Sequence, residues 1–340
     1  MRNADHICFL ASQEGRRLRA RRISGEDDDT DALSVPPTVS WIDISRDSAS
    51  GRLKAVGSGH GGHENEGRMQ YVCAFLDRMV LPYMEEAGGR LAGRYAIELH
   101  DSYTYLEHLP PDDLNRAYDN VMVFSRDRTH AHPVLIPDPF QMTNFGGGLD
   151  RLEDRVAWKD KEDRMFFAGT TTGNRDPSKN ERIKKCVWSL QHRDVADYFI
   201  THVAQMDMRD ALRAVPDLPR VIRGRLAQDH HTRYRVAVNI AGNTCSWSRV
   251  PMVMKTRSVL FDYYCDDMTW YYPAMQDGLH YVSVDGENVL QKHAEVAGNE
   301  SRCNAICDAA NIFVANYTRS VHAAAYMKHL LEASVYHNSP

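Results

Sequence analysis

The sequence predicts an α/β protein of two domains built around parallel sheets. Three observations lead to this prediction. The chain has 340 residues, which is long for one hydrophobic core and comfortable for two. Short apolar runs typical of strands alternate with helical patterns, and such alternation is typical of parallel sheets covered by helices on both faces. A charged stretch at residues 155–164 leads into a second series of strands, so we expect a domain boundary near residue 160.

The first 67 residues show little regular pattern, and we expect them to be partly irregular. A basic cluster, RRLRARR, is followed by the acidic run EDDDTD, and adjacent blocks of opposite sign are typical of solvated segments. Apolar residues then recur at helical spacing over residues 68–84, which predicts an amphipathic helix. Apolar runs predict strands at 94–102 and 120–126, and an extended segment at 132–140.

The second half repeats this organisation. We predict strands over residues 165–169, 233–242, 257–264 and 279–284. We predict helices over residues 304–317 and 320–336. The expected domains are an N-terminal domain over residues 1–160, a second domain over 161–318, and a C-terminal helix over 319–340. This last helix is expected to be able to pack back on the N-terminal domain.

Composition limits the classes of function. A net charge of −5 gives no general attraction to nucleic acid, so any anion site must be local and no nucleic-acid partner is expected. The 7 cysteines are odd in number and form no CxxC pair, which favours a reducing compartment. No stretch approaches the roughly 18 apolar residues of a membrane span. We therefore expect a cytoplasmic protein, with at most peripheral membrane contact through the arginine cluster.

The stretch FFAGTTTGNRDPSKNERIKKC, residues 166–186, places a glycine–threonine loop between an apolar strand and a cationic helix. Backbone amides at a helix start, the hydroxyls of Thr170 and Thr172 and the guanidinium of Arg175 together suit a phosphate group. The spacing is not that of a Walker A loop. Taken alone, the stretch agrees equally well with an exposed loop and a solvated cationic helix.

A second loop, NIAGNTCSWSR, repeats the arrangement after another strand. The residues that could contact a ligand there are Gly242, Asn243, Thr244, Ser246, Ser248 and Arg249. We expect Asn243, Thr244 or Ser246 to cap the following helix and leave its amides facing the ligand. Because the carboxyl ends of parallel strands meet at one edge of a sheet, a diphosphate between Arg175 and Arg249 is the economical hypothesis.

Asp101 ends a predicted strand and is the candidate general base, although an isolated Asp at a strand end is more often a turn residue. No metal is expected, because the DxD matches lie in the polar N-terminal tract. A metal hydrolase built on His60, His63 and Glu64 is the least favoured alternative, since their spacing differs from HExxH.

Four segments in this order resemble the sequence blocks of glycosyltransferase family 90: FFAGTTTGNRDP, RYRVAVNIAGNTCSWSR, SVLF and WYYPAMQDGLHYVSV. The resemblance extends roughly from residue 94 to the C-terminus. The family includes protein O-glucosyltransferases and transferases that modify capsules and lipopolysaccharide. The resemblance implies a GT-B fold, in which two Rossmann-like domains with parallel sheets face an interdomain cleft. It also implies a UDP-sugar donor, inversion at the anomeric carbon, and no metal or other cofactor.

By position, the resemblance makes Asp101 the catalytic base. Thr170 and Arg175 fall in the diphosphate block, and residues 243–249 in the block around the nucleotide. The chain departs from the family pattern at three positions: Ala168, Ala241 and Thr269. The expected activity is transfer of glucose or xylose to a hydroxyl of a glycan or protein. The alternative is a non-catalytic protein that binds UDP-sugar or glycan on a degenerate transferase scaffold.

Overall fold

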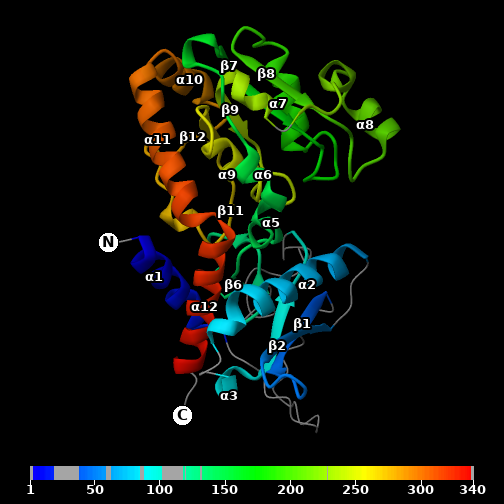
Figure 1. Ribbon diagram of the computed structural model, residues 1–340. Helices are drawn as coiled ribbons and strands as arrows, with labels where there is room; N and C mark the ends of the chain where they lie inside the picture. The colour runs from blue at the N-terminus through cyan, green and yellow to red at the C-terminus, as the bar shows by residue number, and fades with distance from the viewer. Residues whose placement is uncertain are drawn as a thin grey trace. The chain divides into compact units, whose positions relative to one another are not determined.

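The protein is described by a computed structural model (Figure 1). It describes residues 3–18, 38–58, 63–84, 88–101, 118, 120–130, 132–227 and 229–337. The chain forms two compact units. Unit 1 comprises Met1–Gly146, Asp266–Tyr271 and Asn316–Pro340, and unit 2 comprises Gly147–Cys265 and Tyr272–Ala315. The division thus falls earlier than residue 160, and unit 1 includes a short segment from the second half of the chain.

Unit 1 contains a five-stranded sheet of order β2-β1-β3-β4-β6. Its strands are β1 (Val39–Arg46), β2 (Leu53–Ser58), β3 (Gly93–Glu98), β4 (Met122–Val123) and β6 (Val134–Leu135). β3, β4 and β6 pair in parallel, whereas β1 pairs antiparallel with both β2 and β3. The sheet is therefore mixed, because β1 and β2 form a hairpin whose short turn needs no crossover.

The hairpin lies within the first 67 residues, for which the sequence pattern predicts partly irregular structure. Its turn is stabilised by Asp47, whose carboxylate accepts hydrogen bonds from the backbone N and the hydroxyl of Ser50 at 2.9 and 2.6 Å. Gly51 adopts φ of 69°, a left-handed conformation that favours glycine. Asp47 and Gly51 thus form the turn at which β1 ends and the chain reverses into β2.

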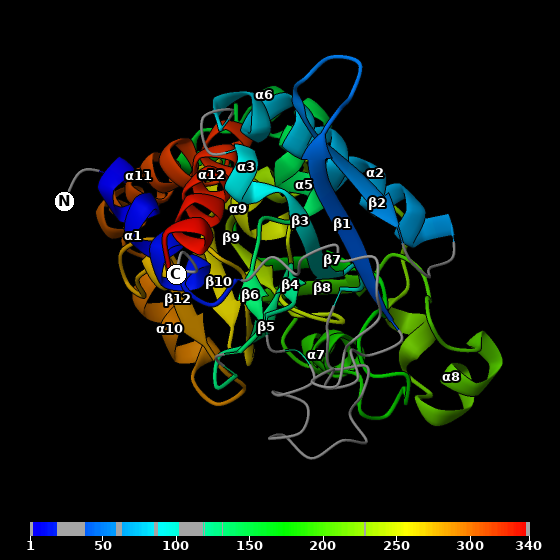
Figure 2. The ribbon, with the colours of Figure 1, turned by 90° about the horizontal axis from the view of Figure 1, so that it is seen from below.

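The helices of unit 1 are α1 (Asn3–Gly15), α2 (His63–Phe75), α3 (Gly88–Leu91), α5 (Pro139–Met142) and α12 (Ser320–His337). The predicted helix at 68–84 is confirmed: α2 begins earlier and continues through a π-helical turn at Leu76–Val80 and a 3-10 turn at Leu81–Tyr83. α1 lies alongside α12 (Figures 1 and 2). Gly15 permits this packing, since a Cβ there would lie 2.4 Å from the carbonyl oxygen of Leu330.

The short segment of unit 1 from the second half of the chain is held by a small antiparallel pair, β5 (Arg126–Asp127) and β11 (Asp267–Met268). Next to β11, Trp270 is buried, and its indole Nε1 donates to Gln141 Oε1 at 2.7 Å. Trp270 also packs against Tyr326 of α12, with ring centroids 4.4 Å apart. These contacts explain why residues near 270 fold with unit 1.

Unit 2 contains a five-stranded sheet of order β12-β10-β9-β7-β8 in which every pair is parallel. Its strands are β7 (Glu162–Gly169), β8 (Ala196–Ile200), β9 (Tyr234–Asn239), β10 (Val259–Tyr263) and β12 (Val282–Val284). Four of them confirm predicted strands, and β8 was not predicted. The strands are buried because helices cover a parallel sheet on both faces.

The helices of unit 2 are α6 (Gly148–Arg151), α7 (Glu181–Ser189), α8 (Met208–Ala214), α9 (Arg249–Met254), α10 (Val289–Ala297) and α11 (Glu300–Tyr317). Short 3-10 turns lie at Asn144–Gly147, Trp158–Asp160, Leu218–Val221, His230–Arg233 and Tyr272–Ala274. One core cluster joins strand residues such as Phe167 and Val236 to Ile183 of α7 and Cys307 of α11. This core fixes the two loops that follow β7 and β9.

Asp138 of unit 1 provides a stability prediction. It caps α5 by accepting from the backbone N of Phe140 and Gln141 at 2.8 and 3.2 Å. The residue is 1% exposed. Burial raises the pKa of its carboxyl group from 3.8 to about 7. Because the folded state binds the proton more tightly, the free energy of unfolding decreases as pH rises between these values.

Asp138→Asn retains a capping oxygen without the charge. We expect it to raise the free energy of unfolding above pH 7 by on the order of 2–4 kcal/mol, with the gain disappearing toward pH 4. Thermal unfolding between pH 4 and 8 measures this. Asp207→Asn is the matched control, because Asp207 caps α8 in the same way at an exposed position. A loss of stability at pH 8 in Asp138→Asn would contradict the argument.

Candidate active site

The strand order of unit 2 reverses between β7 and β9. From β7 the chain proceeds to β8 on one side, and then from β9 to β10 and β12 on the other. In open parallel sheets, ligands bind outside the carboxyl ends of the strands at such a switch point. The two glycine-containing loops begin there: the first at Thr170, after β7, and the second at Ile240, after β9. The topology therefore identifies these loops as the candidate ligand site of unit 2.

The two loops are in direct contact. The backbone N of Gly173 donates to Asn243 Oδ1 at 2.9 Å. Gly173 has φ of 121°, a conformation that side-chain-bearing residues rarely adopt. A Cβ on Gly242 would lie 2.6 Å from Thr172 Oγ1 and 2.9 Å from Arg182 Nη2. Glycine at both positions thus allows the loops to close against each other.

Arg182, on the first turn of α7, connects both loops and is only 8% exposed. Its Nη1 donates to Thr172 Oγ1 at 2.5 Å and to the carbonyl oxygen of Thr170 at 3.2 Å. Its Nε donates to the carbonyl oxygens of Ile240 and Ala241, each at 3.1 Å. All these partners are neutral. The guanidinium therefore orders the site and keeps its full positive charge there.

Arg249, the first residue of α9, places a second guanidinium beside the first. Its Nη2 donates to the carbonyl oxygen of Ala168 at 2.6 Å. Its guanidinium lies 4.5 Å from the ring centroid of Phe167, and that of Arg182 lies 6.0 Å from the same ring. The Nη1 of Arg249 is buried and has no hydrogen-bond partner in the described part of the chain. Arg249 Nη1 can therefore donate a hydrogen bond to a ligand at this site.

The two arginines form an uncompensated pair of charges. Within the residues that the structure describes, neither forms a salt bridge with a carboxylate. Burial lowers the pKa of Arg182 to about 10. Burial, followed by the charge of Arg182, lowers the pKa of Arg249 to about 9. Both groups remain cationic at neutral pH, and buried cations are stable only when an opposite charge compensates them. The pair fits an anionic group such as a phosphate.

A cavity of about 250 Å³ lies beside Arg249. Its walls present polar and apolar surface in similar amounts and come from β7, the end of β8, β9, α9 and the segment before β9; they include Ala168, Thr201, Leu226, His231, Ala237 and Met252. Such a cavity can hold a flat or weakly polar group next to the cationic pair.

The structure places the residues of the first predicted loop as follows. Thr170 and Thr172 contact Arg182, whereas Arg175 lies exposed. The expected row of free amides at the start of α7 is wrong in part. Asn180 caps this helix, its Oδ1 accepting from the backbone N of Ile183 at 3.1 Å. The expected solvated cationic helix is also wrong for Arg182, which is buried.

In the second loop the predicted cap is wrong. The N-cap of α9 is Ser248, which makes no side-chain capping bond, and Asn243 instead bonds to Gly173. Thr244 is 6% exposed. The hydroxyl of Ser246 is buried without a hydrogen-bond partner in the described chain. The loop is therefore shaped by contact with its neighbour rather than by capping a helix.

Arg182 was not among the predicted site residues. The helical spacing of the sequence places Arg182 on the same face as the apolar residues of α7. The buried residues of this helix are Arg182, Ile183, Cys186 and Ser189. An arginine on the apolar face of a helix that follows a glycine loop indicates a buried charge with a function.

In unit 1, Asp101 closely follows β3 and is partly exposed. Its Oδ1 accepts from Arg68 Nη2 at 2.7 Å. The same arginine donates through Nη1 to the carbonyl oxygen of Leu99 at 2.6 Å, and Ser125 Oγ donates to the carbonyl oxygen of Asp101 at 2.7 Å. Arg68 of α2 thus fixes the position of the Asp101 carboxylate relative to the end of β3.

Next to Asp101, His100 is held by the buried carboxylate of Glu98, which is 1% exposed. Glu98 Oε1 lies 2.5 Å from His100 Nδ1, and Glu98 Oε2 accepts from the Tyr118 hydroxyl at 3.2 Å. His100 Nε2 lies 3.2 Å from Asn65 Nδ2. The hydrogen bond to Glu98 raises the pKa of His100 above its ordinary value.

Glu98→Gln is therefore expected to shift the titration of His100 to lower pH, because the amide no longer stabilises the imidazolium. Because the pKa of His100 is raised in the folded state, its bond to Glu98 stabilises the fold most at low pH. This stabilisation is lost as the pH rises through the folded-state pKa of His100. NMR titration of the His100 ring protons measures the shift. Tyr118→Phe is the control, since it removes the other partner of Glu98 without changing its charge. An unchanged midpoint in Glu98→Gln would contradict this assignment.

Two further findings concern metals and membranes. Over the described ranges, no three His, Cys, Asp or Glu side chains gather as metal ligands. His60 and the side chains of His63 and Glu64 lie outside the described residues, so that hypothesis stays a prediction. None of the described helices is both long and apolar enough to cross a membrane.

The family model "Glycosyl transferase family 90" matches residues 142–336, more than half of the chain. None of the curated proteins compared with the chain matches it. Several solved structures show some similarity. One is the C-terminal domain of a glycosyl transferase group 1 family protein (LpcC) from Francisella tularensis. It is 11% identical in sequence with a TM-score of 0.33, and the match covers 47% of this chain and 89% of that one. WaaG, a glycosyltransferase involved in lipopolysaccharide biosynthesis, has 9% identity, a TM-score of 0.36 and coverage of 66% and 68%. A glycosyltransferase from Rickettsia africae ESF-5 has 11% identity, a TM-score of 0.37 and coverage of 68% and 69%.

Proposed function

Because the chain belongs to glycosyltransferase family 90 and forms two α/β units, we propose that it transfers glucose or xylose from a UDP-sugar to a hydroxyl group. The acceptor is a hydroxyl of a glycan or protein, and transfer inverts the anomeric carbon without a metal. The observation that carries the proposal is the pair of cationic guanidinium groups of Arg182 and Arg249, which no carboxylate neutralises within the described chain.

In this proposal the arginine pair binds the diphosphate of UDP. As the bond between C1 of the sugar and the β-phosphate oxygen breaks, negative charge grows on the departing UDP. Fixed cations that already lie in place stabilise that charge without reorganisation. The free donor Nη1 of Arg249 is suited to a phosphate oxygen. We assign the nucleobase to the cavity beside Arg249, which distinguishes a nucleotide ligand from free phosphate.

Asp101 acts as the base in this proposal. Its carboxylate takes the proton of the acceptor hydroxyl as the oxygen attacks C1 from the face opposite UDP. A new C–O bond forms, the bond to UDP breaks, and the proton ends on Asp101. One carboxylate suffices, because UDP leaves as a stabilised anion, whereas most glycosidases need a pair. Arg68 supports this role by holding the Asp101 carboxylate in place.

A non-catalytic protein that binds UDP-sugar or glycan is the second candidate. The departures at Ala168, Ala241 and Thr269 favour it. Thr269 is fully buried, with a hydroxyl that lacks a hydrogen-bond partner in the described chain, so it is not positioned as an exposed sugar ligand.

UDP release from a panel of UDP-sugars, measured in EDTA, tests the proposal. Transferases hydrolyse their donors slowly, so water can serve as acceptor. We expect turnover of UDP-glucose or UDP-xylose that EDTA does not abolish. Turnover of neither sugar, together with retained UDP binding, would favour the binding protein. Turnover only after a divalent cation is restored would overturn metal independence.

A further inference from the structure

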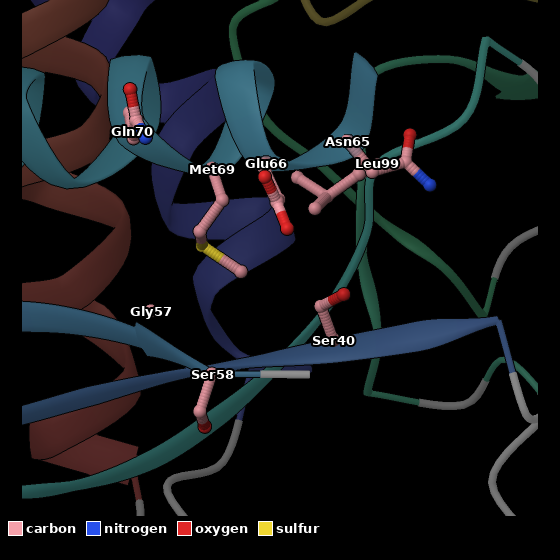
Figure 3. Close-up of a pocket in the computed structure, with 8 residues that line it drawn as sticks. All are labelled: Ser40, Gly57, Ser58, Asn65, Glu66, Met69, Gln70 and Leu99. Atoms are coloured by element: carbon pink, nitrogen blue, oxygen red, sulfur yellow. The ribbon is translucent and has the colours of Figure 1, made fainter. Parts of the chain in front are cut away.

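A pocket of about 200 Å³ lies in unit 1, between α2 and the hairpin strands β1 and β2 (Figure 3). Figure 3 shows Glu66 and Met69 extending from α2 toward the strands, and Ser40 extending from β1 toward the helix. The other lining residues are Gly57, Ser58, Asn65, Gln70 and Leu99. Gly57 allows α2 to approach β2, since a Cβ there would lie 2.2 Å from Met69 Cγ.

A serine hydroxyl that bonds to none of the described residues faces the pocket. Ser40 is 3% exposed, and its hydroxyl makes no hydrogen bond with any residue that the structure describes. It points into the space that Glu66 also enters. A hydroxyl that faces a pocket can both donate to and accept from water or a ligand there. The pocket therefore has the features of a binding site.

The chemical groups that line the pocket limit the class of ligand it can bind. None of the described residues that line the pocket is Lys or Arg, and the carboxylate of Glu66 disfavours an anion. The hydroxyl, amide and carboxylate groups also disfavour an apolar ligand. Hydroxyl groups both donate and accept, and amides and serines offer the matching partners. The volume is below the roughly 300–1,000 Å³ of sites for drug-sized ligands. A single neutral ring that carries several hydroxyls meets these conditions.

The pocket is coupled to the segment of the proposed base. Arg68, which precedes the pocket residue Met69, binds both Leu99 and Asp101. Asn65 lies at the edge of the pocket and contacts His100 Nε2 at 3.2 Å. The same helix therefore lines the pocket and fixes Asp101, so a ligand in the pocket lies on an element that positions the base.

We propose that this pocket binds one sugar ring of a glycan acceptor, with the Glu66 carboxylate and the Ser40 hydroxyl bonding to its hydroxyl groups. The inference rests on the proposed function, because it selects glycan over protein as the acceptor class. Charge-assisted hydrogen bonds contribute more than neutral ones, so Glu66 contributes the larger share of affinity.

Saturation-transfer NMR of the full chain with methyl glycosides of glucose, galactose, mannose and xylose tests the inference. We expect at least one to bind in the millimolar range without donor. Glu66→Ala should weaken it about 10- to 100-fold, and Ser40→Ala by about 3- to 10-fold. Glu300→Ala, at an exposed position in α11, is the matched control and should bind normally.

UDP titration of the same variants separates this inference from the proposed function. UDP binding by wild type and both variants, with no glycoside bound or with binding insensitive to Glu66 and Ser40, would overturn the pocket assignment alone. Loss of UDP binding by wild type would instead remove the proposed function. Binding of a serine-containing peptide in the pocket, but of no glycoside, would overturn glycan as the acceptor class.

Discussion

Asp101→Asn is expected to lower kcat for sugar transfer or donor hydrolysis by about 10²- to 10⁴-fold, while UDP affinity changes by less than about twofold. Asparagine keeps an oxygen that can accept the hydrogen bond from Arg68 Nη2, so the local structure is preserved. It cannot take the proton of the attacking hydroxyl. The chemical step therefore slows, and binding of UDP through the arginines of unit 2 does not depend on this carboxylate.

UDP-release kinetics and calorimetric UDP titration measure the two quantities on the same protein. Asp43→Asn is the matched control, because Asp43 also belongs to unit 1 and binds an arginine, with its Oδ1 2.8 Å from Arg94 Nε. It should leave kcat unchanged. Near-normal turnover in Asp101→Asn would remove Asp101 as the base, and His100, supported by Glu98, would be the next group to test.

Arg249→Met is expected to raise the Kd for UDP by about 10- to 100-fold, since hydrogen bonds to charged groups contribute about 1.5–3 kcal/mol. Methionine keeps an apolar stem over Phe167 and removes the charge and the fork of donors. Arg182→Met should weaken UDP at least as much. It should also lower thermal stability, because Arg182 connects both loops through its bonds to Thr172 and Ile240.

Calorimetry gives the Kd values, and thermal unfolding separates lost binding from lost structure. Arg209→Met is the matched control, because Arg209 lies exposed on α8 of the same unit. An unaltered Kd in Arg249→Met, with the fold intact, would mean that the buried guanidinium has a structural role only.

The sheet of unit 2 was largely predictable, because four of its strands are apolar runs bounded by loop residues. β8 was missed because Asp197 interrupts its apolar pattern. The fold compensates for this carboxylate: Tyr234 donates its hydroxyl at 2.9 Å and Arg223 its Nη1 at 2.6 Å. The hairpin of unit 1 was missed because its strands lie next to charged segments. Its pairing with β3 in one mixed sheet also joins parts of the chain that are distant in sequence.

The placement of the candidate site residues was predictable where they follow strands. Asp101 and the loops at Gly169 and Gly242 each follow a strand, and strand ends in parallel sheets are where ligands bind. The burial of Arg182 and the role of Asn243 were not predictable, because they depend on contact between loops about 70 residues apart in sequence. Local spacing instead predicted an independent helix cap, which the contact with Gly173 replaced.

Parallel calorimetric titrations of UDP and of uridine into the wild-type chain, both in EDTA, test whether the arginine pair binds the diphosphate. Uridine retains the base and ribose but lacks the diphosphate that Arg182 and Arg249 would bind. We expect UDP to bind at least about 100-fold more tightly than uridine, because two charge-assisted contacts are lost without the phosphates. Equal affinities for the two ligands, or no binding of UDP, would contradict it.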